Sequence, residues 1–191
     1  MLDADVQWVS LADFKDITEV KEDGKTFAEN ALKKAIGYAK QTELWTIADD
    51  SGLVIDALGG KPGIKSARFS GCKEPDRTLL DHKNMAKVLK LLKGVPSKKR
   101  TARFVCCLCL ACPEFIEGAS PDNILAETEG TLEGLIAEKE IGENGFGYDP
   151  IFFVPGLNKT VAQLTREEKN KISHRGNAIR KLKPLLKSLL K

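Results

Sequence analysis

The chain has 191 residues, and its 30 Lys and Arg against 27 Asp and Glu give a formal net charge of +3. Hydrophobic residues make up 42% and charged residues 30%, which is typical of a globular domain and excludes intrinsic disorder. The longest apolar run, 105–112, has eight residues, far short of the roughly 20 that a membrane helix needs, and the acidic N-terminus is untypical of a targeting peptide. We expect one soluble, cytoplasmic domain over 1–191 with no membrane partner.

Hydrophobic spacing predicts alternating strands and helices in the first half of the chain. Short strands are expected at 6–11 and 17–20, and a helix with one apolar face is expected over 26–41. An apolar strand at 45–48 leads into the acidic pair Asp49-Asp50, and extended chain continues over 53–57 before a Gly/Pro-rich loop. A second helix is expected over 76–93, between Pro75 and Gly94.

The second half continues the same alternation. A central apolar strand is expected over 101–112, and a strand interrupted by Gly130 and Gly134 over 125–137. A short strand follows at 151–154, then two helices, one beginning at Thr165 and one ending at the C-terminus. No repeat or low-complexity linker divides the chain, so the pattern predicts a single α/β domain.

Four of the five cysteines crowd the expected central strand, and two interpretations compete for them. The spacing Cys109-x-x-Cys112 matches half of a zinc site, but a second ligand pair elsewhere in the sequence is missing. The apolar neighbours favour a buried strand in which cysteine packs as a small hydrophobic residue. We therefore favour a core role over zinc for the cluster, which consists of Cys106, Cys107, Cys109 and Cys112.

Charge is distributed unevenly along the chain. Segment 122–143 has seven acidic groups and one lysine, and segment 166–191 has nine basic groups and two acidic ones. A basic segment suggests an anionic partner such as a phosphorylated small molecule or nucleic acid. Within 180–191 a leucine stripe favours a solvated amphipathic helix instead.

The segment Asp49-Asp50-Ser51-Gly52 is the first candidate site. Carboxylates that follow an apolar strand lie where α/β sheets place ligands, and two adjacent acids suit a hard cation such as Mg²⁺. Ser51 could donate to a phosphate oxygen. The alternative is an ordinary Asp-Ser-Gly turn.

Glu29 is the second candidate, and it also has two interpretations. Thr26 and Glu29 have the spacing of a helix capping box, in which the glutamate reaches back to the helix N-terminus. Glu29 also lies beside the apolar helix face, so it could lean over the sheet and bind a metal. Spacing alone favours the cap.

A glycine-rich aromatic loop over 144–150 is the third candidate. Gly145 and Gly147 flank Phe146, so a flat ligand could approach the backbone and stack on the ring. The alternative is a simple turn into the strand at 151–154. Further along the chain, Lys169, His174 and Arg175 could meet phosphate or purine groups. For His174 a plain helix-terminus residue is the alternative.

Four sequence blocks occur in order along the chain. They are TFAENALKKA (26–35), IADDSGLVIDALGGKPGIKSARFSG (47–71), GFGYDPIFF (145–153) and LTREEKNKISHRG (164–176). Together they resemble the inosine/xanthosine triphosphate pyrophosphatase (Ham1-like) family, from about Trp8 to the end. The resemblance implies an α/β fold with a long mixed, twisted sheet flanked by helices, and two lobes with a substrate cleft between them.

The resemblance also implies an activity and a set of roles. Such enzymes hydrolyse ITP, dITP and XTP to the monophosphate and pyrophosphate, and are usually homodimers that act on free nucleotides rather than nucleic-acid polymers. Carried over, Glu29 and Asp50 would hold Mg²⁺, and Asp50 would accept a proton from water. This favours the ligand role for Glu29, beside its cap role. The substrate would be bound by Ser51, Phe146, Gly147, Tyr148, Asp149, Lys169, His174 and Arg175.

One departure from the family pattern concerns phosphate binding. The family opens with a strand and a Ser/Thr-Gly-Asn-x-x-Lys loop that holds the triphosphate, and this sequence has no such segment. We expect an upstream start site that supplies it, because every later motif is intact. The alternative is a truncated, non-catalytic or folding-impaired nucleotide-binding chain.

Overall fold

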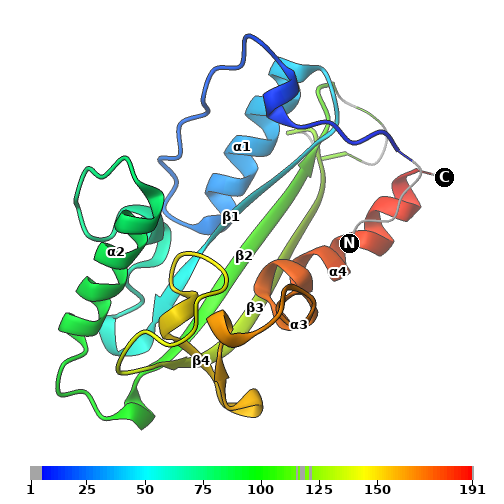
Figure 1. Ribbon diagram of the computed structural model, residues 1–191. Coiled ribbons are helices and arrows are strands. Elements are labelled where there is room, and N and C mark those ends of the chain that lie inside the picture. Colours follow the sequence, from blue (N-terminus) through cyan, green and yellow to red (C-terminus); the bar gives the residue numbers. More distant parts are fainter. Residues whose placement is uncertain (1–5, 115, 117–118, 121, 191) are drawn as a thin grey trace. The chain divides into compact units, whose positions relative to one another are not determined.

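The structure is a computed structural model, and it describes residues 6–114, 116, 119–120 and 122–190. Four α-helices and five strands occur in the described chain (Figure 1). The helices are α1 (Phe27–Thr42), α2 (Arg77–Leu91), α3 (Arg166–Ile172) and α4 (His174–Leu189). The strands are β1 (Thr46–Ile55), β2 (Thr101–Ala111), β3 (Ile124–Ile136), β4 (Phe152–Val154) and β5 (Lys159–Thr160). None of the described helices is both long and apolar enough to span a bilayer.

The five strands form one open sheet in the order β1-β2-β3-β4-β5. Strand β4 pairs with β3 and β5 in antiparallel register, with Ile136 opposite Phe152 and Phe153 opposite Thr160. The α/β class with flanking helices is confirmed, and the sheet is antiparallel where the sequence predicts a mixed one. The short connection from β4 to β5, from Val154 to Lys159, permits only antiparallel pairing there.

The chain divides into two compact units, as expected for two lobes. The first unit comprises Met1–Asp50, Cys106–Gly130 and Arg175–Lys191, and the second comprises Ser51–Val105 and Thr131–His174. The long strands β1, β2 and β3 each contribute residues to both units. The cleft expected between the lobes stays a prediction.

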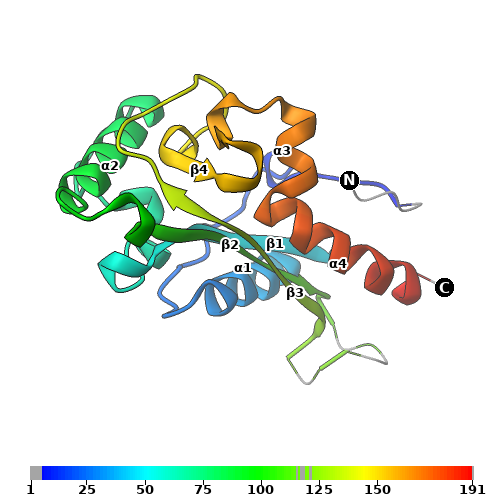
Figure 2. The same cartoon turned by 90° about the horizontal axis from the view of Figure 1, so that it is seen from below.

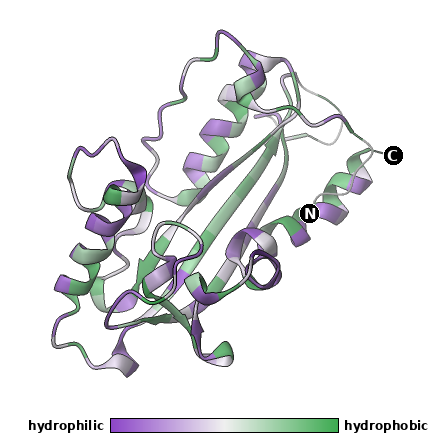
Figure 3. Cartoon of the chain, in the orientation of Figure 1, coloured by the Kyte–Doolittle hydropathy of each residue, from purple (hydrophilic) through white to green (hydrophobic). Residues whose placement is uncertain are grey.

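In the first unit the sheet is covered on both faces, by α1 on one side and α4 on the other (Figure 2). Strand β2 is apolar along most of its length (Figure 3), and on the α4 side its side chains pack against Leu182 and Leu186. The packed β2 residues are Cys106, Leu108 and Leu110. The prediction of a core role for the cysteine cluster is confirmed, because its four members are buried.

Burial also changes the acidity of two of these thiols. Burial raises the pKa of Cys107 and of Cys109 to about 12. Among the described residues no group of three or more His, Cys, Asp or Glu side chains could hold a metal.

The second unit has its own hydrophobic core. Phe152 of β4 is fully buried and stacks on Phe104 of β2, with ring centroids 4.4 Å apart. Met85 and Val88 close this core from α2, and Ile136 closes it from β3. The core supports the loop that precedes β4, which carries several of the predicted site residues.

Helix boundaries follow the capping residues that the sequence indicates. Thr26 accepts a hydrogen bond from the Glu29 N–H at the start of α1, and Asp76 accepts from the Thr78 and Leu79 N–H groups at the start of α2. Thr165 forms a full capping box with Glu168 at the start of α3. Each cap satisfies N–H groups that the first helical turn leaves unpaired.

Two expected strands are absent from the described chain, and the prediction of strands at 6–11 and 17–20 is wrong. Leu11–Asp13 instead forms a short 3₁₀ turn. At 17–20 the backbone is held by side chains of α1, since Thr18 donates to Gln41 Oε1 and Val20 donates to Tyr38 Oη. Side-chain partners replace the ladder that a strand would need.

The region around the acidic pair also differs from the prediction. The expected pieces at 45–48 and 53–57 form one continuous strand, β1, so Asp49 to Gly52 are neither a turn nor a strand end. Strand β3 likewise continues through Gly130 and Gly134. At Gly134 a Cβ would lie 2.5 Å from the Phe152 ring, so this glycine allows close packing rather than breaking the strand.

Candidate functional site

The predicted site residues fall into two groups, one in each unit. In the first unit, Asp50 is a half-buried carboxylate in the middle of β1, with its side chain 15% exposed. Its Oδ2 accepts from Asn30 Nδ2 at 3.1 Å, and its Oδ1 lies 3.3 Å from Lys34 Nζ. Both partners come from α1. Asp50 is therefore fixed by two donors on the helix that covers this face of the sheet.

The environment of Asp50 shifts its acidity. Burial raises the pKa of Asp50 above its ordinary value, and Lys34 and Asn30 oppose the shift by stabilising the carboxylate. A more basic carboxylate is a better proton acceptor. Asp50 thus combines fixed geometry with a raised pKa.

Asn30 and Lys34 are site residues that the sequence analysis missed. Asn30 is buried, and its Oδ1 accepts from the Gly24 N–H at 2.8 Å while its amide holds Asp50. Lys34 also contacts Glu22 Oε2, at 3.1 Å. The available signal was their spacing of four residues on α1, which places both on one helix face.

Glu29 occupies the capping position that its spacing indicates. Its Oε2 accepts from the Lys25 N–H at 2.7 Å, and its side chain is exposed. The Glu29 side chain does reach back to the helix N-terminus, but its partner is the Lys25 N–H and not the Thr26 N–H of a capping box. The ligand role stays a prediction. The two roles are compatible, because one carboxylate oxygen remains outside this hydrogen bond.

Asp49 and Asp50 do not share one site, contrary to the expectation of two acids around one cation. Successive side chains of a strand point to opposite faces, and the carboxylate of Asp49 pairs with Arg175, with Nε 2.8 Å from Oδ2. Arg175, predicted to bind the nucleotide, is therefore ion-paired in this structure.

The donors in the first unit fit a small, hard cation that keeps several other ligands. Glu29 and Asp50 offer carboxylate oxygens, which Mg²⁺ prefers, and proteins typically bind Mg²⁺ through one or two carboxylates plus substrate phosphates and water. The carboxylate oxygens of this donor set therefore suit a hard divalent cation.

In the second unit the structure brings Phe146, Asp149 and Lys169 together. Asp149 is buried, its Oδ2 accepts from the Phe146 N–H at 2.9 Å, and it forms an ion pair with Lys169. The Lys169 ammonium also lies over the Phe146 ring, 4.4 Å from its centroid. Phe146 is 59% exposed, so this loop presents an aromatic ring and a cation at the surface.

Glycines permit the tight geometry of this loop. Gly145 has φ +82°, and a Cβ there would lie 2.0 Å from Asp149 Oδ2. Any side chain at this position would displace the carboxylate that holds Phe146 and Lys169. The loop therefore requires glycine at position 145 for both conformation and space.

Tyr148 and His174 are placed less favourably for direct contact through their side chains. Tyr148 is buried, and its hydroxyl donates to the Ser66 carbonyl at 2.7 Å; burial also raises its pKa well above the usual range. His174 begins α4, is buried, and stacks on Phe104 at 4.9 Å between centroids. Both side chains anchor the fold in this structure.

Ser51 follows Asp50 directly in β1 and is partly exposed. Its neighbour Leu53 is tied by its N–H to Ser66 Oγ at 2.9 Å. The strand therefore holds Ser51 in place, and its role toward substrate stays a prediction.

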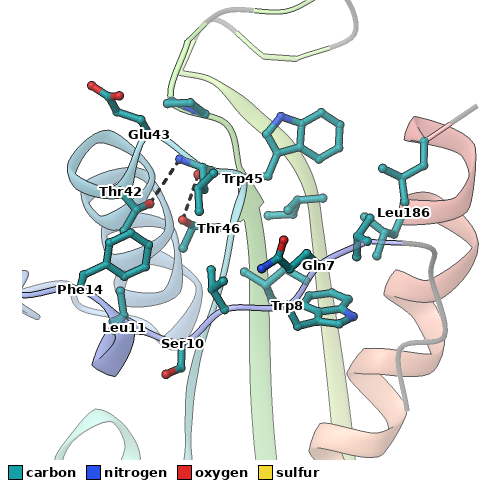
Figure 4. Close-up of a pocket in the computed structure, with 17 residues that line it drawn as sticks. Gln7, Trp8, Ser10, Leu11, Phe14, Thr42, Glu43, Trp45, Thr46 and Leu186 are labelled. Atoms are coloured by element: carbon teal, nitrogen blue, oxygen red, sulfur yellow. Dashed lines mark hydrogen bonds between the residues drawn. The ribbon is translucent and has the colours of Figure 1, made fainter.

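A separate apolar cavity of about 620 Å³ lies in the first unit (Figure 4). Trp8 and Leu11 line it from the N-terminal segment, Trp45 from the start of the β1 region, and Leu186 from α4. It contains none of the predicted site residues, and Glu43 is the acidic residue of its wall. Its lining is unlike the polar surroundings of Asp50.

Comparison with known proteins gives consistent matches over nearly the whole chain. The model of the Ham1 family matches residues 1–185. A protein from Desulforamulus reducens named dITP/XTP pyrophosphatase is 48% identical to this chain, over 96% of this chain and 85% of that protein. A protein of the same name from Bacillus subtilis is also 48% identical, over 94% of this chain and 84% of that protein. The solved Staphylococcus aureus Ham1 protein aligns with a TM-score of 0.77 and 43% identity, covering 90% of this chain and 81% of that one.

Proposed function

Because the chain belongs to the Ham1 family, we propose that it hydrolyses dITP, ITP and XTP to the nucleoside monophosphate and pyrophosphate. The observation that carries the proposal is Asp50, a half-buried carboxylate of raised pKa fixed by Asn30 and Lys34. The named relatives support the choice of substrate, since several are dITP/XTP pyrophosphatases about 50% identical to this chain.

In the proposed reaction Asp50 accepts a proton from water. The water oxygen forms a bond to the α-phosphorus, the bond from the α-phosphorus to the α–β bridging oxygen breaks, and its electron pair leaves with pyrophosphate. Asn30 and Lys34 keep the Asp50 carboxylate oriented while this transfer occurs. Their donors face the carboxylate already, so little reorganisation is needed.

We propose that Glu29 and Asp50 hold Mg²⁺ together with the triphosphate. When bound, the cation neutralises negative charge on the phosphates. Glu29 would supply an oxygen from the first turn of α1, where its backbone is fixed by the Thr26 cap. Ser51 would donate its hydroxyl to substrate from the next position of β1.

Purine binding is assigned to the loop in the second unit. Phe146 would stack on the base, Gly147 and Tyr148 would contact it through their backbones, and Asp149 would hold Lys169 for charge recognition. His174 and Arg175 would complete the nucleotide site. Hydrogen-bond donors of the protein that face the 6-keto oxygen of a deaminated purine would face the 6-amino group of ATP, which offers them no acceptor. Deaminated purines would therefore be preferred over ATP.

The assembly and location follow the family expectation. We propose a homodimer that acts on free purine nucleoside triphosphates in the cytoplasm, rather than on a nucleic-acid polymer. Size-exclusion chromatography with light scattering distinguishes a dimer from the monomer of 20.9 kDa.

The products and the metal requirement test the proposed reaction. Incubation of the purified protein with dITP should give dIMP and pyrophosphate in equal amounts, without dIDP, as separated by ion-exchange chromatography. Removing divalent metal with a chelator should lower the rate at least about 100-fold, because the triphosphate charge is then unscreened, and Mg²⁺ should restore it. Formation of dIDP and phosphate, or an unchanged rate with the chelator, would contradict the mechanism. Absence of any turnover would favour the alternative of a non-catalytic nucleotide-binding protein.

A further inference from the structure

Asp81 makes an unusual contact between α2 and the aromatic loop of the second unit. Its Oδ2 accepts from the Gly147 N–H at 2.7 Å, across 66 positions of sequence. The side chain is 10% exposed although it is an acid in a helix. A short hydrogen bond to an ionised, nearly buried acceptor is among the stronger kinds in proteins.

The second oxygen of Asp81 has a different partner. Oδ1 lies 3.2 Å from Nε of Arg77, whose side chain is 61% exposed. One carboxylate oxygen of Asp81 thus contacts a surface cation, and the other accepts a hydrogen bond from the loop backbone. This division allows the two contacts to be removed separately.

Two glycines with positive φ make the backbone of this loop costly to order, so each hydrogen bond to its backbone matters. Gly145 and Gly147 have φ of +82° and +64°, and glycine has the largest backbone freedom to lose on ordering. Within the loop, Asp149 accepts from the Phe146 N–H. Outside it, the Tyr148 hydroxyl donates to the Ser66 carbonyl, which ties a side chain and not the loop backbone. The Gly147 N–H, next to the exposed ring of Phe146, is held from α2.

We infer that Asp81 is a positioning residue that fixes the loop around Phe146 in its purine-binding conformation before substrate arrives; this rests on the proposed function. Asp81 touches Gly147 and not the substrate, so it acts through the loop. An anchored loop loses less conformational entropy on binding, which raises affinity without changing the chemical step.

The inference predicts a separation between binding and turnover. Asp81→Ala should raise KM for dITP about tenfold and leave kcat within about twofold, since a hydrogen bond to a charged acceptor is lost while the chemical groups are unaltered. Asp81→Asn should recover most of the affinity because its amide oxygen still accepts from the Gly147 N–H. Binding of dIMP, measured by calorimetry, should weaken in parallel with KM.

Two further measurements separate positioning from general stability. Arg77→Gln removes the surface ion pair but keeps the loop contact, so its KM should match that of the parent. Hydrogen exchange without nucleotide, followed by mass spectrometry on peptides that cover 143–150, should be faster in Asp81→Ala than in the parent and in Arg77→Gln. Thermal unfolding of each variant shows whether it is folded.

The outcomes distinguish this inference from the proposed function. If the parent hydrolyses dITP and Asp81→Ala has the parent's KM, or if Asp81→Asn is as impaired as Asp81→Ala, the positioning role is overturned and the proposed function stands. If kcat falls while KM is unchanged, Asp81 acts on the chemical step and the inference is wrong. If the parent neither binds dIMP nor hydrolyses dITP, the proposed function fails and the inference fails with it, whatever the exchange rates.

Discussion

Asp50→Asn should abolish hydrolysis, lowering kcat by about 10²–10⁴-fold, because an amide cannot accept a proton from water. The substitution preserves size, and its oxygen can still accept the Asn30 hydrogen bond that now reaches Asp50 Oδ2. Binding of dIMP should persist within about tenfold, since purine recognition is assigned to the other unit. Steady-state release of pyrophosphate and calorimetric binding of dIMP measure the two effects.

The adjacent carboxylate provides the matched control. Asp49→Asn removes the same charge one position earlier, but Asp49 faces Arg175 on the opposite side of the strand. That ion pair is partly exposed on both sides, so its loss should have a modest effect, lowering kcat less than about tenfold. Equal losses in the two variants would show that net charge, rather than proton transfer at Asp50, controls the rate.

Asp149→Ala should weaken both the fold of the second unit and nucleotide binding. The Asp149 side chain is 4% exposed and that of Lys169 is 20% exposed, so removing the acid leaves a mostly desolvated ammonium without this partner. Removing one partner of a buried ion pair lowers the free energy of unfolding by several kcal/mol. Because Lys169 is not fully buried, we expect a loss at the lower end, about 2–4 kcal/mol. Denaturant unfolding measures the loss, and KM for dITP should rise in parallel as Phe146 loses its backbone acceptor.

A double-mutant cycle identifies the origin of that loss. Asp149→Ala combined with Lys169→Met removes both charges, so the double variant should be more stable than Asp149→Ala alone. Asp149→Asn keeps an acceptor for the Phe146 N–H and should preserve part of the affinity. If the two single effects simply add, the ion pair is not the source of the instability.

The sequence was sufficient for elements whose signals are local. Thr26 caps α1 and Thr165 caps α3 as their spacing indicates, because caps depend on side chains within three residues of the helix start. The buried cysteines of β2 follow from the apolar run around them. The reach of Glu29 back to the helix N-terminus was likewise visible, since its partner is the nearby Lys25 N–H.

Features that depend on distant neighbours were not predictable from spacing alone. The segment Asp49 to Gly52 has the composition of a turn, yet it continues β1 because the sheet pairs its backbone through these positions. Once this segment is known to be a strand, Asp49 and Asp50 are expected on opposite faces of the sheet, because successive side chains of a strand alternate between the two faces. The contacts of Asp50 with Asn30 and of Asp81 with Gly147 join residues 20 and 66 positions apart, which only the folded chain brings together.

Discrimination between purine bases tests the central claim most directly. With Mg²⁺ present, kcat/KM for dITP should exceed that for dATP by about 10-fold to 150-fold. The physical reason is that the 6-amino group of dATP leaves one hydrogen-bond donor of the protein unpaired, at a cost of ~1.5–3 kcal/mol. The measurement is pyrophosphate release from each nucleotide under the same conditions, with Asp50→Asn as the inactive control. A ratio well above one, with neither nucleotide hydrolysed by Asp50→Asn, would support a dITP/XTP pyrophosphatase. Equal hydrolysis of dITP and dATP would contradict it.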